Sequence, residues 1–374
     1  MNAAETFDVA IIGGGLVGAA IAFGLRSLGA RLVVLDEGDV AYRASRGNFG
    51  LIWVQGKGAG LPPYGAWTQR SAREWPRLAA ELAVETGIDV ALSQTGGVHV
   101  CLSADELDRR GAKLAALFAQ PGFERYDIEV LDHAALARRL PGIGPDVVGG
   151  TWGALDGHCN PLKLLRALHA AIAGAGCAYR AERFVTWIAP AADGFELETP
   201  AGRIVAGRIV LAAGLGNARL APMVGLDAPV RPNKGQVIAL ERVPPFLSLP
   251  VETIRQTDEG TVLVGDAQQE AGLDEMPGLD VLATMAARAV RVFPHLAGVR
   301  VNRAWAALRV MTPDGFPIYE QSADHPGAYV ATCHSGVTLA AMHAYALAPA
   351  IADGALPGAF NPFTSQRFDV PQAA

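Results

Sequence analysis

The chain has 374 residues, 51% of them hydrophobic, so we expect two domains with sizeable cores. A net charge of −6 without a basic block argues against nucleic acid or an anionic membrane as the main partner, and no stretch is apolar for long enough to cross a bilayer. Because we see no signal peptide, and because the four cysteines (101, 159, 177 and 333) have neither disulfide-framework nor metal-ligand spacing, we expect a cytoplasmic protein without a metal site.

The first predicted element is a buried parallel strand over residues 9–12, which runs directly into a cluster of glycines. Gly13, Gly15 and Gly18 form a G-x-G-x-x-G pattern, which allows a tight turn, a close approach of a pyrophosphate and close packing of a helix on the strand. A helix is predicted over about residues 16–28, with its N-terminal amides directed towards the phosphates.

Gly29 is expected to end that helix, and a second strand over residues 31–35 then ends at two acidic residues, Asp36 and Glu37. An acid about 20 positions beyond the glycines is placed to hold a ribose hydroxyl, and Asp36, directly at the strand end, is the better candidate. This order of strand, glycines, helix and strand favours a dinucleotide site, without distinguishing NAD from FAD.

A loop of small, polar and glycine residues, 44–53, follows the second strand. It can run along an extended ligand, with Ser45 and Arg46 near phosphate and residues 48–51 near a ring, or it can be an ordinary surface turn. The glycine-rich segment behind it suggests a closely approached or mobile stretch.

The middle of the chain departs from the alternation of strands and helices. We predict a helix over residues 68–86, weakened by Pro76, a strand over residues 96–102 and a charged helix over residues 104–118. A second domain is therefore expected to start near residue 87.

The later elements are predicted from caps, apolar runs and turns. Residues 333–338 lead from a strand into the last long helix, which is expected in the core, so a second helix N-terminus is available to an electron-rich ligand. The other predictions are a helix over 161–173 capped by Asn160, strands over 184–188 and 195–198, a hairpin edge and buried strand within 203–214, a strand over 237–240, a hairpin of 254–256 and 262–264, a helix over 279–292 and a strand over 328–332.

Several motifs occur in order along the chain: the glycine pattern with Asp36, residues 156–161, residues 210–214, residues 229–232 with Lys234-Gly235-Gln236, Leu308-Arg309 with Thr312-Pro313-Asp314-Gly315, and His334-Ser335-Gly336. Together they resemble the D-amino-acid oxidase superfamily of FAD enzymes over nearly the whole chain, which implies that the dinucleotide is FAD. Within the superfamily, the loop from Ala41 to Trp53 with residues 54–58 looks most like the β subunits of heteromeric dye-linked dehydrogenases, such as the B subunit of opine oxidase, the hydrogen cyanide synthase C subunit and D-hydroxyproline or proline dehydrogenase β.

The resemblance implies an α/β fold, with a discontinuous Rossmann-like FAD-binding domain and a second α+β substrate domain built on an antiparallel sheet. The FAD domain would comprise residues 1–86, 146–222 and 303–374, and the substrate domain residues 87–145 and 223–302. The break in the strand–helix alternation near residue 87 agrees with this division.

The family oxidises the Cα–N bond of an amino acid by hydride transfer to flavin N5, followed by hydrolysis of the imine. Arg309 matches the family's arginine before the Thr-Pro-Asp-Gly turn and is implied as a bidentate clamp for the substrate carboxylate, the alternative being a surface ion pair. His334 is a catalytic candidate whose alternative role is structural. Gln55, with Trp53 and Lys57, could line the substrate side or simply shape its loop.

The resemblance also implies the FAD contacts. Backbone amides of residues 336–338 would face the N1–C2=O side of the flavin and stabilise the negative charge that develops there on reduction. Val185 would pack on the adenine, whereas Lys234 is assigned a structural or weakly flavin-related role. The expected contacts are Gly13, Gly15, Leu16, Val17, Gly18, Asp36, Glu37, Ser45, Arg46, Asn48, Phe49, Gly50, Leu51, Val185, Ala213, Gly214, Arg309, Gly336, Val337 and Thr338.

Two departures from the family pattern matter. Some relatives attach FAD through a cysteine just before the turn that follows Arg309, but this chain has no cysteine between Cys177 and Cys333, so we expect non-covalent FAD. Glycine oxidase has a second arginine after its C-terminal Gly-His, which Cys333-His334-Ser335 lacks, so a glycine-oxidase mode of substrate binding is in doubt.

The leading hypothesis is a catalytic FAD subunit of a multi-subunit dehydrogenase for a secondary or N-substituted amino acid, such as an opine or hydroxyproline. We expect a hetero-oligomer with an electron-accepting α subunit and a small iron–sulfur subunit, with FMN and the cluster held by these partners. The alternatives are a self-contained amino-acid oxidase that reduces oxygen, a flavin electron-relay subunit without a substrate site, and an NAD-dependent dehydrogenase.

Overall fold

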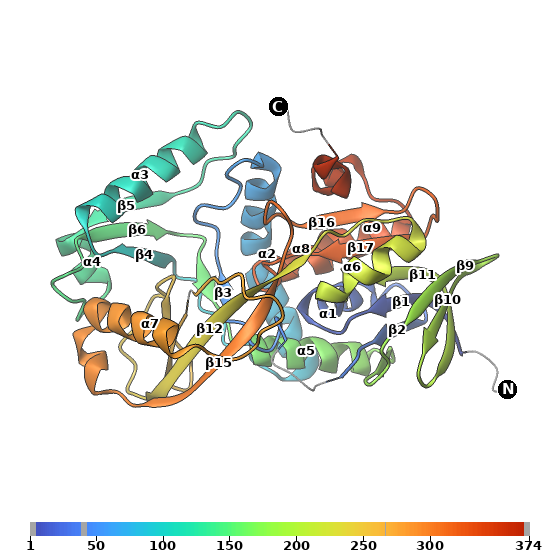
Figure 1. Cartoon of the computed structure of the whole chain (residues 1–374), viewed down its shortest axis with the longest axis horizontal. Helices are drawn as coiled ribbons and strands as arrows, with labels where there is room; N and C mark the ends of the chain where they lie inside the picture. Colours follow the sequence, from blue (N-terminus) through green and yellow to red (C-terminus); the bar gives the residue numbers. More distant parts are fainter. Residues whose placement is uncertain (1–4, 39–42, 266, 370–374) are drawn as a thin grey trace.

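The computed structural model describes residues 5–38, 43–265 and 267–369, and it has two halves that two long strands connect across the middle (Figure 1). These strands are β12 (Arg231–Arg242) and β15 (Val301–Met311), which pair antiparallel along most of their length. Ala41, where the loop similar to dehydrogenase β subunits is expected to begin, and both ends of the predicted FAD domain lie outside the described residues.

A mostly parallel sheet forms one half of the molecule. Its strand order is β16-β17-β11-β1-β2-β8, in which β1 pairs in parallel with both β2 and β11. The β9–β10 hairpin extends the sheet from β11, and β16 is antiparallel to β17. The bounds are β1 Glu5–Ile12, β2 Leu32–Leu35, β8 Ala178–Arg180, β9 Trp187–Ala191, β10 Gly194–Thr199, β11 Gly202–Leu211, β16 Ile318–Gln321 and β17 Ala328–Thr332.

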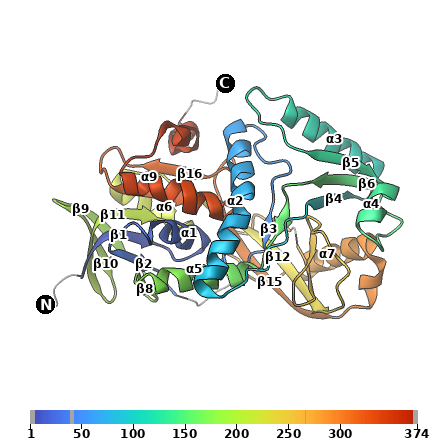
Figure 2. The ribbon, with the colours of Figure 1, turned by 180° about the vertical axis from the view of Figure 1, so that it is seen from behind.

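Apolar helices cover one face of this sheet. α1 contains only apolar residues and glycines because it is buried on nearly all sides, and α2 runs along the middle of the molecule between the two halves (Figure 2). The opposite face packs against α6 and the 3₁₀ turn η2, and the β9–β10 hairpin contributes Ile188, Phe195 and Leu197 to the same core. The bounds are α1 Leu16–Leu25, α2 Pro62–Thr86, α5 Pro161–Gly174, α6 Asn217–Leu220, η2 Ala221–Val224, α8 Ala340–Met342, the π-helical segment η4 His343–Leu347 and α9 Ala348–Asp353.

Antiparallel sheets form the other half. Their strand orders are β13-β14-β12-β15 and β4-β6-β5, and an isolated bridge between Val98 and Val251 connects them. A short β3–β7 pair and further 3₁₀ turns complete the chain. The bounds are β3 Leu51–Ile52, β4 Gly97–Cys101, α3 Ala104–Phe118, β5 Ile128–Asp132, α4 His133–Arg139, β6 Gly149–Gly153, β7 Gly157–His158, η1 Gly214–Gly216, β13 Ile254–Gln256, β14 Thr261–Val264, α7 Leu279–Val292, η3 Pro294–Gly298, η5 Gly358–Phe363 and η6 Ser365–Phe368.

These sheets confirm the predicted fold class, a parallel α/β sheet combined with separate antiparallel sheets. The exact domain borders stay a prediction, and β6 and β15, which lie close to two of those borders, belong to the antiparallel sheets. No helix in the described part of the chain has the length and apolar character needed to cross a membrane. The cytoplasmic location likewise stays a prediction.

The ends of α1 and α2 differ from the predictions. α1 ends at Leu25, because the Arg26 side chain binds the carbonyl of Phe23, so Gly29 is not its cap although it has a positive φ of 74°. α2 begins earlier than predicted, at Pro62, since a proline suits the first helical turn. The helix continues through Pro76, which has no N–H for the carbonyl of Ala72, and Gln94 Nε2 donates to that carbonyl instead at 2.8 Å.

Two later predictions also need correction. The strand expected over residues 184–188 begins at Trp187, because Arg219 binds the carbonyl oxygens of Val185 and Thr186, each at 2.7 Å. The last helix is interrupted by the π-helical segment η4, where the hydroxyl of Tyr319 lies 2.8 Å from His343 Nε2. Such a bulge re-spaces the residues of a helix.

We expect Gly24→Ala to destabilise the protein, because a Cβ at residue 24 of α1 would lie 2.2 Å from the carbonyl oxygen of Ala344. Overpacking of this kind costs roughly 1–3 kcal/mol of unfolding free energy. Gly111→Ala is the matched control, since residue 111 is inside α3 and has no heavy atom within 4 Å of its Cβ position. That change should stabilise by about 0.5–1 kcal/mol. Urea unfolding of both variants measures the difference, and similar shifts would contradict the packing.

Candidate functional site

The glycine turn after β1 is packed too closely to accept side chains. Gly13 has a φ of +107°, and a Cβ there would lie 2.3 Å from the carbonyl oxygen of Ala212 at the end of β11. A Cβ on Gly18 would lie 1.9 Å from the carbonyl oxygen of Gly13. The turn therefore brings the N-terminus of α1 directly over the ends of two neighbouring strands.

The side chains around this turn bind its backbone amides. Asp36, at the end of β2, accepts hydrogen bonds from Gly14 N at 2.7 Å and from Gly38 N at 2.9 Å. Ser45 Oγ accepts from Leu16 N, in the first turn of α1, at 2.9 Å. Both side chains thus meet the positive end of the helix dipole, where anionic groups bind favourably.

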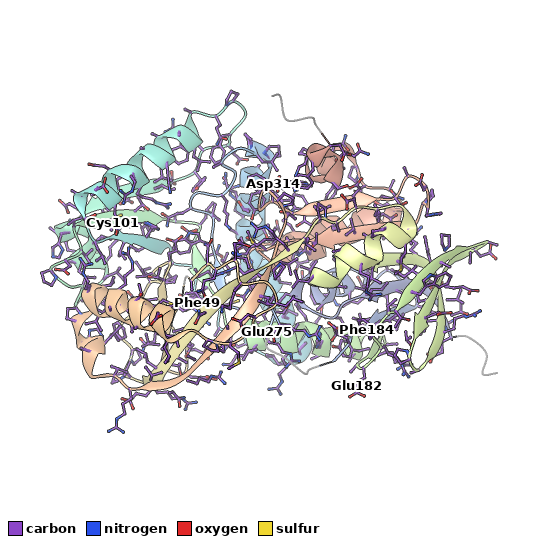
Figure 3. The ribbon with its side chains drawn as sticks, in the orientation of Figure 1. Phe49, Cys101, Glu182, Phe184, Glu275 and Asp314 are labelled. Atoms are coloured by element: carbon purple, nitrogen blue, oxygen red, sulfur yellow. The ribbon has the colours of Figure 1, made fainter. Side chains whose placement is uncertain are left out.

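A cavity of about 590 Å³, here called the long cavity, extends from the glycine turn to the segment after β17. Phe184 and Glu275, labelled in Figure 3, belong to its wall, and so does Thr332, whose buried hydroxyl has no partner among the described residues. The predicted FAD contacts in its wall are Gly13, Gly15, Leu16, Val17, Asp36, Glu37, Ser45, Arg46, Asn48, Val185, Ala213, Gly214 and Gly336.

A second cavity of about 250 Å³, the short cavity, adjoins the long one, and Ala44, Asn48 and His334 line both. Phe49, labelled in Figure 3, lies in its wall and packs against a small apolar cluster that includes Val237 and Ala239 of β12. The predicted site residues in its wall are Asn48, Phe49, Leu51, Trp53, Lys57, Arg309, His334, Val337 and Thr338.

The two cavities together fit an FAD molecule beside a substrate. The glycine turn and the N-terminus of α1 suit the pyrophosphate, and Val185, at the far end, suits the adenine. A flavin ring would then lie at the junction at Asn48 and His334, which would leave the short cavity to a second molecule. Such pockets are typical of ligand sites, because they are concave and combine apolar walls with a few polar groups.

Arg309 belongs to β15 and lies opposite Asn233 of β12. Its Nη1 donates to Asn233 Oδ1 at 3.2 Å and to the carbonyl oxygen of Ala267 at 2.7 Å. Room for the guanidinium depends on Gly235, because a Cβ there would lie 2.7 Å from it. The sheet therefore holds the planar guanidinium in the wall of the short cavity.

His334 is neutral at physiological pH. Burial, together with the nearby positive charges of Lys57 and Arg309, lowers the pKa of His334 to about 3. Its Nδ1 lies 3.3 Å from Ser335 Oγ, which accepts hydrogen bonds from Lys57 Nζ and the Tyr64 hydroxyl, both at 3.1 Å. A hydroxyl that accepts two hydrogen bonds has its own proton left to donate, so this arrangement favours the tautomer in which Nδ1 accepts and Nε2 has the proton.

Several predicted residues lie outside both cavities. The amide of Gln55, a predicted catalytic group, donates to the carbonyl of Gly97 at 3.0 Å and accepts from Thr151 and Arg110 at 2.6 and 3.0 Å. Gln55 therefore helps to shape its loop. Neither Gly18 nor Gly50 lines a cavity, and Lys234 Nζ instead binds Asp274 and the carbonyl of Met276.

Two side chains in the wall of the short cavity, Ser335 and Glu252, were not predicted as site residues from the sequence, and neither was Tyr64, which binds Ser335. Ser335 stood out only as part of a motif, and Tyr64, which binds it, follows the two prolines that begin α2. Glu252 lies in the short loop before β13 and reaches the cavity wall. No local pattern marks either Tyr64 or Glu252, because their role depends on which distant segments face them.

The four cysteines are free thiols, and Cys101, Cys159 and Cys333 are buried. Burial is the main cause that raises the pKa of Cys159 and that of Cys333 to about 12, so both thiols are protonated at neutral pH. Within the described ranges, no three His, Cys, Asp or Glu side chains are grouped to hold a metal ion.

Comparison with known proteins agrees with this geometry. A family model described as DAO, FAD dependent oxidoreductase, matches residues 8–350. The chain is similar to the B subunits of opine oxidase from Rhizobium meliloti (43% identical) and from Agrobacterium tumefaciens strain Ach5 (44%), in each case over 98% of this chain and 99% of the relative. The crystal structure of glycine oxidase from Geobacillus kaustophilus has a TM-score of 0.88 at 24% identity, covering 96% of this chain and 98% of that one, and so shares the fold.

We expect Asp36→Ala to weaken FAD retention by roughly tenfold or more while the fold stays intact, because the change removes the acceptor at the ribose position and the bond to Gly14. Flavin content after dialysis, together with circular dichroism, measures both effects. Asp193→Ala, in the exposed β9–β10 turn, is the matched control. Equal flavin content in the two variants would contradict the assignment of Asp36 to the ribose.

The buried carboxyl group of Asp156 is expected to make the stability of the protein depend on pH. Its Oδ1 accepts from Val54 N at 2.5 Å and Gln55 N at 3.2 Å, Oδ2 has no described partner, and burial raises its pKa from 3.8 to about 7. Because the pKa of Asp156 is higher in the folded protein than in the unfolded chain, the protonated side chain contributes stability to the folded state at low pH. This contribution is lost as the pH rises through about 7. Asp156→Asn should remove that loss and raise Tm at pH 7.5 by roughly 5 °C, with little gain at pH 4. Parallel Tm curves from pH 4 to 8 for the two proteins would exclude this role.

Proposed function

This chain belongs to the DAO family of FAD-dependent oxidoreductases, and from that premise we propose that it is the catalytic subunit of a multi-subunit dehydrogenase for a secondary or N-substituted amino acid. The family match confirms the predicted resemblance and the use of FAD. One observation supports the rest of the proposal most strongly: the short cavity, with Arg309 in its wall, opens onto the place where the flavin ring fits.

The reaction is the oxidation of a Cα–N bond. Bound FAD supplies the acceptor for the hydride from Cα, while the nitrogen loses a proton and the resulting imine is hydrolysed by water to an oxo acid and an amine. We assign the carboxylate of the substrate to Arg309, because the planar guanidinium binds carboxylates bidentately and so orients the neighbouring Cα–H. The backbone amides of residues 336–338 remain the candidates that stabilise the reduced ring.

The ring of His334 is suited to lie beside the amine nitrogen without adding a charge there. Its ring is neutral, and its Nδ1 accepts from Ser335, so its Nε2–H is the group available to the cavity. A neutral ring does not repel an amine that develops positive charge, whereas an imidazolium would. Tyr64 and Lys57 support this tautomer through Ser335.

The multi-subunit part of the proposal is supported by the two opine oxidase relatives, each of which is named as one subunit of a larger enzyme. We propose an electron-accepting α subunit and a small iron–sulfur subunit as partners, with FMN and the cluster in those chains. FAD in this subunit is proposed to be non-covalent, since Cys333 is buried with a protonated thiol and the other cysteines lie outside both cavities.

The test is anaerobic reduction of the protein-bound flavin by octopine, nopaline, D- and L-proline, hydroxyprolines, sarcosine and glycine. We expect one class to bleach the flavin within seconds, and Arg309→Ala to raise its half-saturating concentration by roughly 100-fold because the bidentate clamp is lost. Arg309→Lys should recover part of that loss. Arg203→Ala, which breaks an exposed pair with Glu196 on the other half, is the control.

The outcomes separate the alternatives. Stoichiometric hydrogen peroxide from the isolated chain in air would favour the self-contained oxidase. Unchanged turnover of the native complex with Arg309→Ala would favour an electron-relay subunit.

A further inference from the structure

Two charged side chains in the short cavity are not used by the carboxylate clamp: Lys57 and Glu252. Lys57 Nζ donates to Ser335 Oγ at 3.1 Å and forms no other hydrogen bond or salt bridge with the described residues. An ammonium group has three N–H donors, so at least two remain for a ligand. Lys57 is only partly buried, which keeps these donors accessible from the cavity.

Glu252 provides the opposite charge. One carboxylate oxygen, Oε2, binds His99 Nδ1, whereas Oε1 accepts no hydrogen bond from a described residue. Burial acts to raise the pKa of Glu252, but the hydrogen bond to His99 and the charges of His99, Arg110 and Lys57 outweigh it and lower the pKa. The carboxylate is therefore ionised, and His99 behind it leaves its other oxygen for the cavity.

Lys57 and Glu252 do not neutralise each other by contact. The charge of Lys57 is close enough to lower the pKa of Glu252, yet among the described residues the two form no ion pair. Two opposite charges held apart in one partly buried cavity, each with unused hydrogen-bonding capacity, suit a ligand that has both an acidic and a basic group.

We propose that Lys57 and Glu252 form a second charged subsite, in which Lys57 binds a second carboxylate of the substrate and Glu252 binds a cationic group. This inference rests on the proposed function, in which Arg309 binds the first carboxylate. It narrows the substrate class to a secondary amine that has two carboxylates and a basic side chain, the chemistry of an opine derived from a basic amino acid.

Three probes separate these groups. All three are secondary amines: octopine has two carboxylates and a guanidinium, iminodiacetate has two carboxylates and no basic side chain, and sarcosine has one carboxylate. The experiment measures the anaerobic bleaching rate of the flavin against probe concentration, with the chain in the assembly in which it purifies. For the native sequence, we expect kcat/KM for flavin reduction to rise in the order sarcosine, iminodiacetate, octopine.

Two variants test which side chain binds which group of the substrate. Glu252→Gln keeps the shape of the side chain and an acceptor for His99, and it should lower kcat/KM for octopine by roughly 10- to 100-fold with little change for iminodiacetate. Lys57→Met should lower kcat/KM for octopine and iminodiacetate by a similar factor with a smaller change for sarcosine. The matched controls are the exposed residues Glu198→Gln in β10 and Lys113→Gln in α3.

A wrong subsite and a wrong proposed function would give different results in this experiment. If the ratio of kcat/KM for octopine to kcat/KM for iminodiacetate were the same in the native and Glu252→Gln proteins, with flavin reduction intact, the subsite alone would be overturned. Preference of the native protein for sarcosine over both dicarboxylates would do the same. A flavin that dithionite reduces but none of the three probes does would overturn the proposed function together with the subsite.

Discussion

The site depends on the close contact of three backbone segments: the turn after β1, the first turns of α1 and the end of β11. At Gly13 and Gly18 there is no room for a Cβ, so helix and strands approach to backbone distance. This contact orients the N-terminus of α1 over one edge of the parallel sheet. The carboxyl ends of β1, β2, β11 and β17 meet at that edge, and the segments that follow them supply the glycine turn, Asp36, Ala213 and His334. Ligands of open α/β sheets bind at such edges.

In the short cavity, charges and burial set the protonation states of the side chains. Arg309 and Lys57 bring two positive charges near His334, and burial would make a third charge more costly still. The imidazole consequently stays neutral. Glu252, on the antiparallel half, balances part of this positive charge, and among the described residues it forms no ion pair with Lys57. The cavity thereby combines separated charges with a neutral ring, an arrangement that suits a substrate with several ionised groups.

Elements whose ends are set by residues close to them in the sequence, such as helix caps, were predictable from the sequence. Ser103 and Asn160 cap α3 and α5 through side-chain hydrogen bonds to nearby amides, and both helices begin where predicted. The ends of α1 and β9 were not predictable in this way, because Arg26 and Arg219 set them through side-chain bonds to backbone carbonyls. In α2, Gln94, from a distant loop, binds the carbonyl of Ala72 that Pro76 leaves without a donor.

The sequence by itself determined the dinucleotide-binding half of this protein, because the glycine pattern, the acid at the end of β2 and the caps act over short distances along the chain. It also placed Arg309 and His334 by motif, and both line the short cavity. Only the tertiary structure decided the rest of that cavity. Ser335 and Glu252 line it from two distant segments, and Tyr64 binds Ser335 from a third. Gln55, two residues from both Trp53 and Lys57 in the sequence, binds Gly97 and Thr151 instead. Their positions follow from how β12 and β15 bring the two halves together, a long-range arrangement that no local pattern encodes.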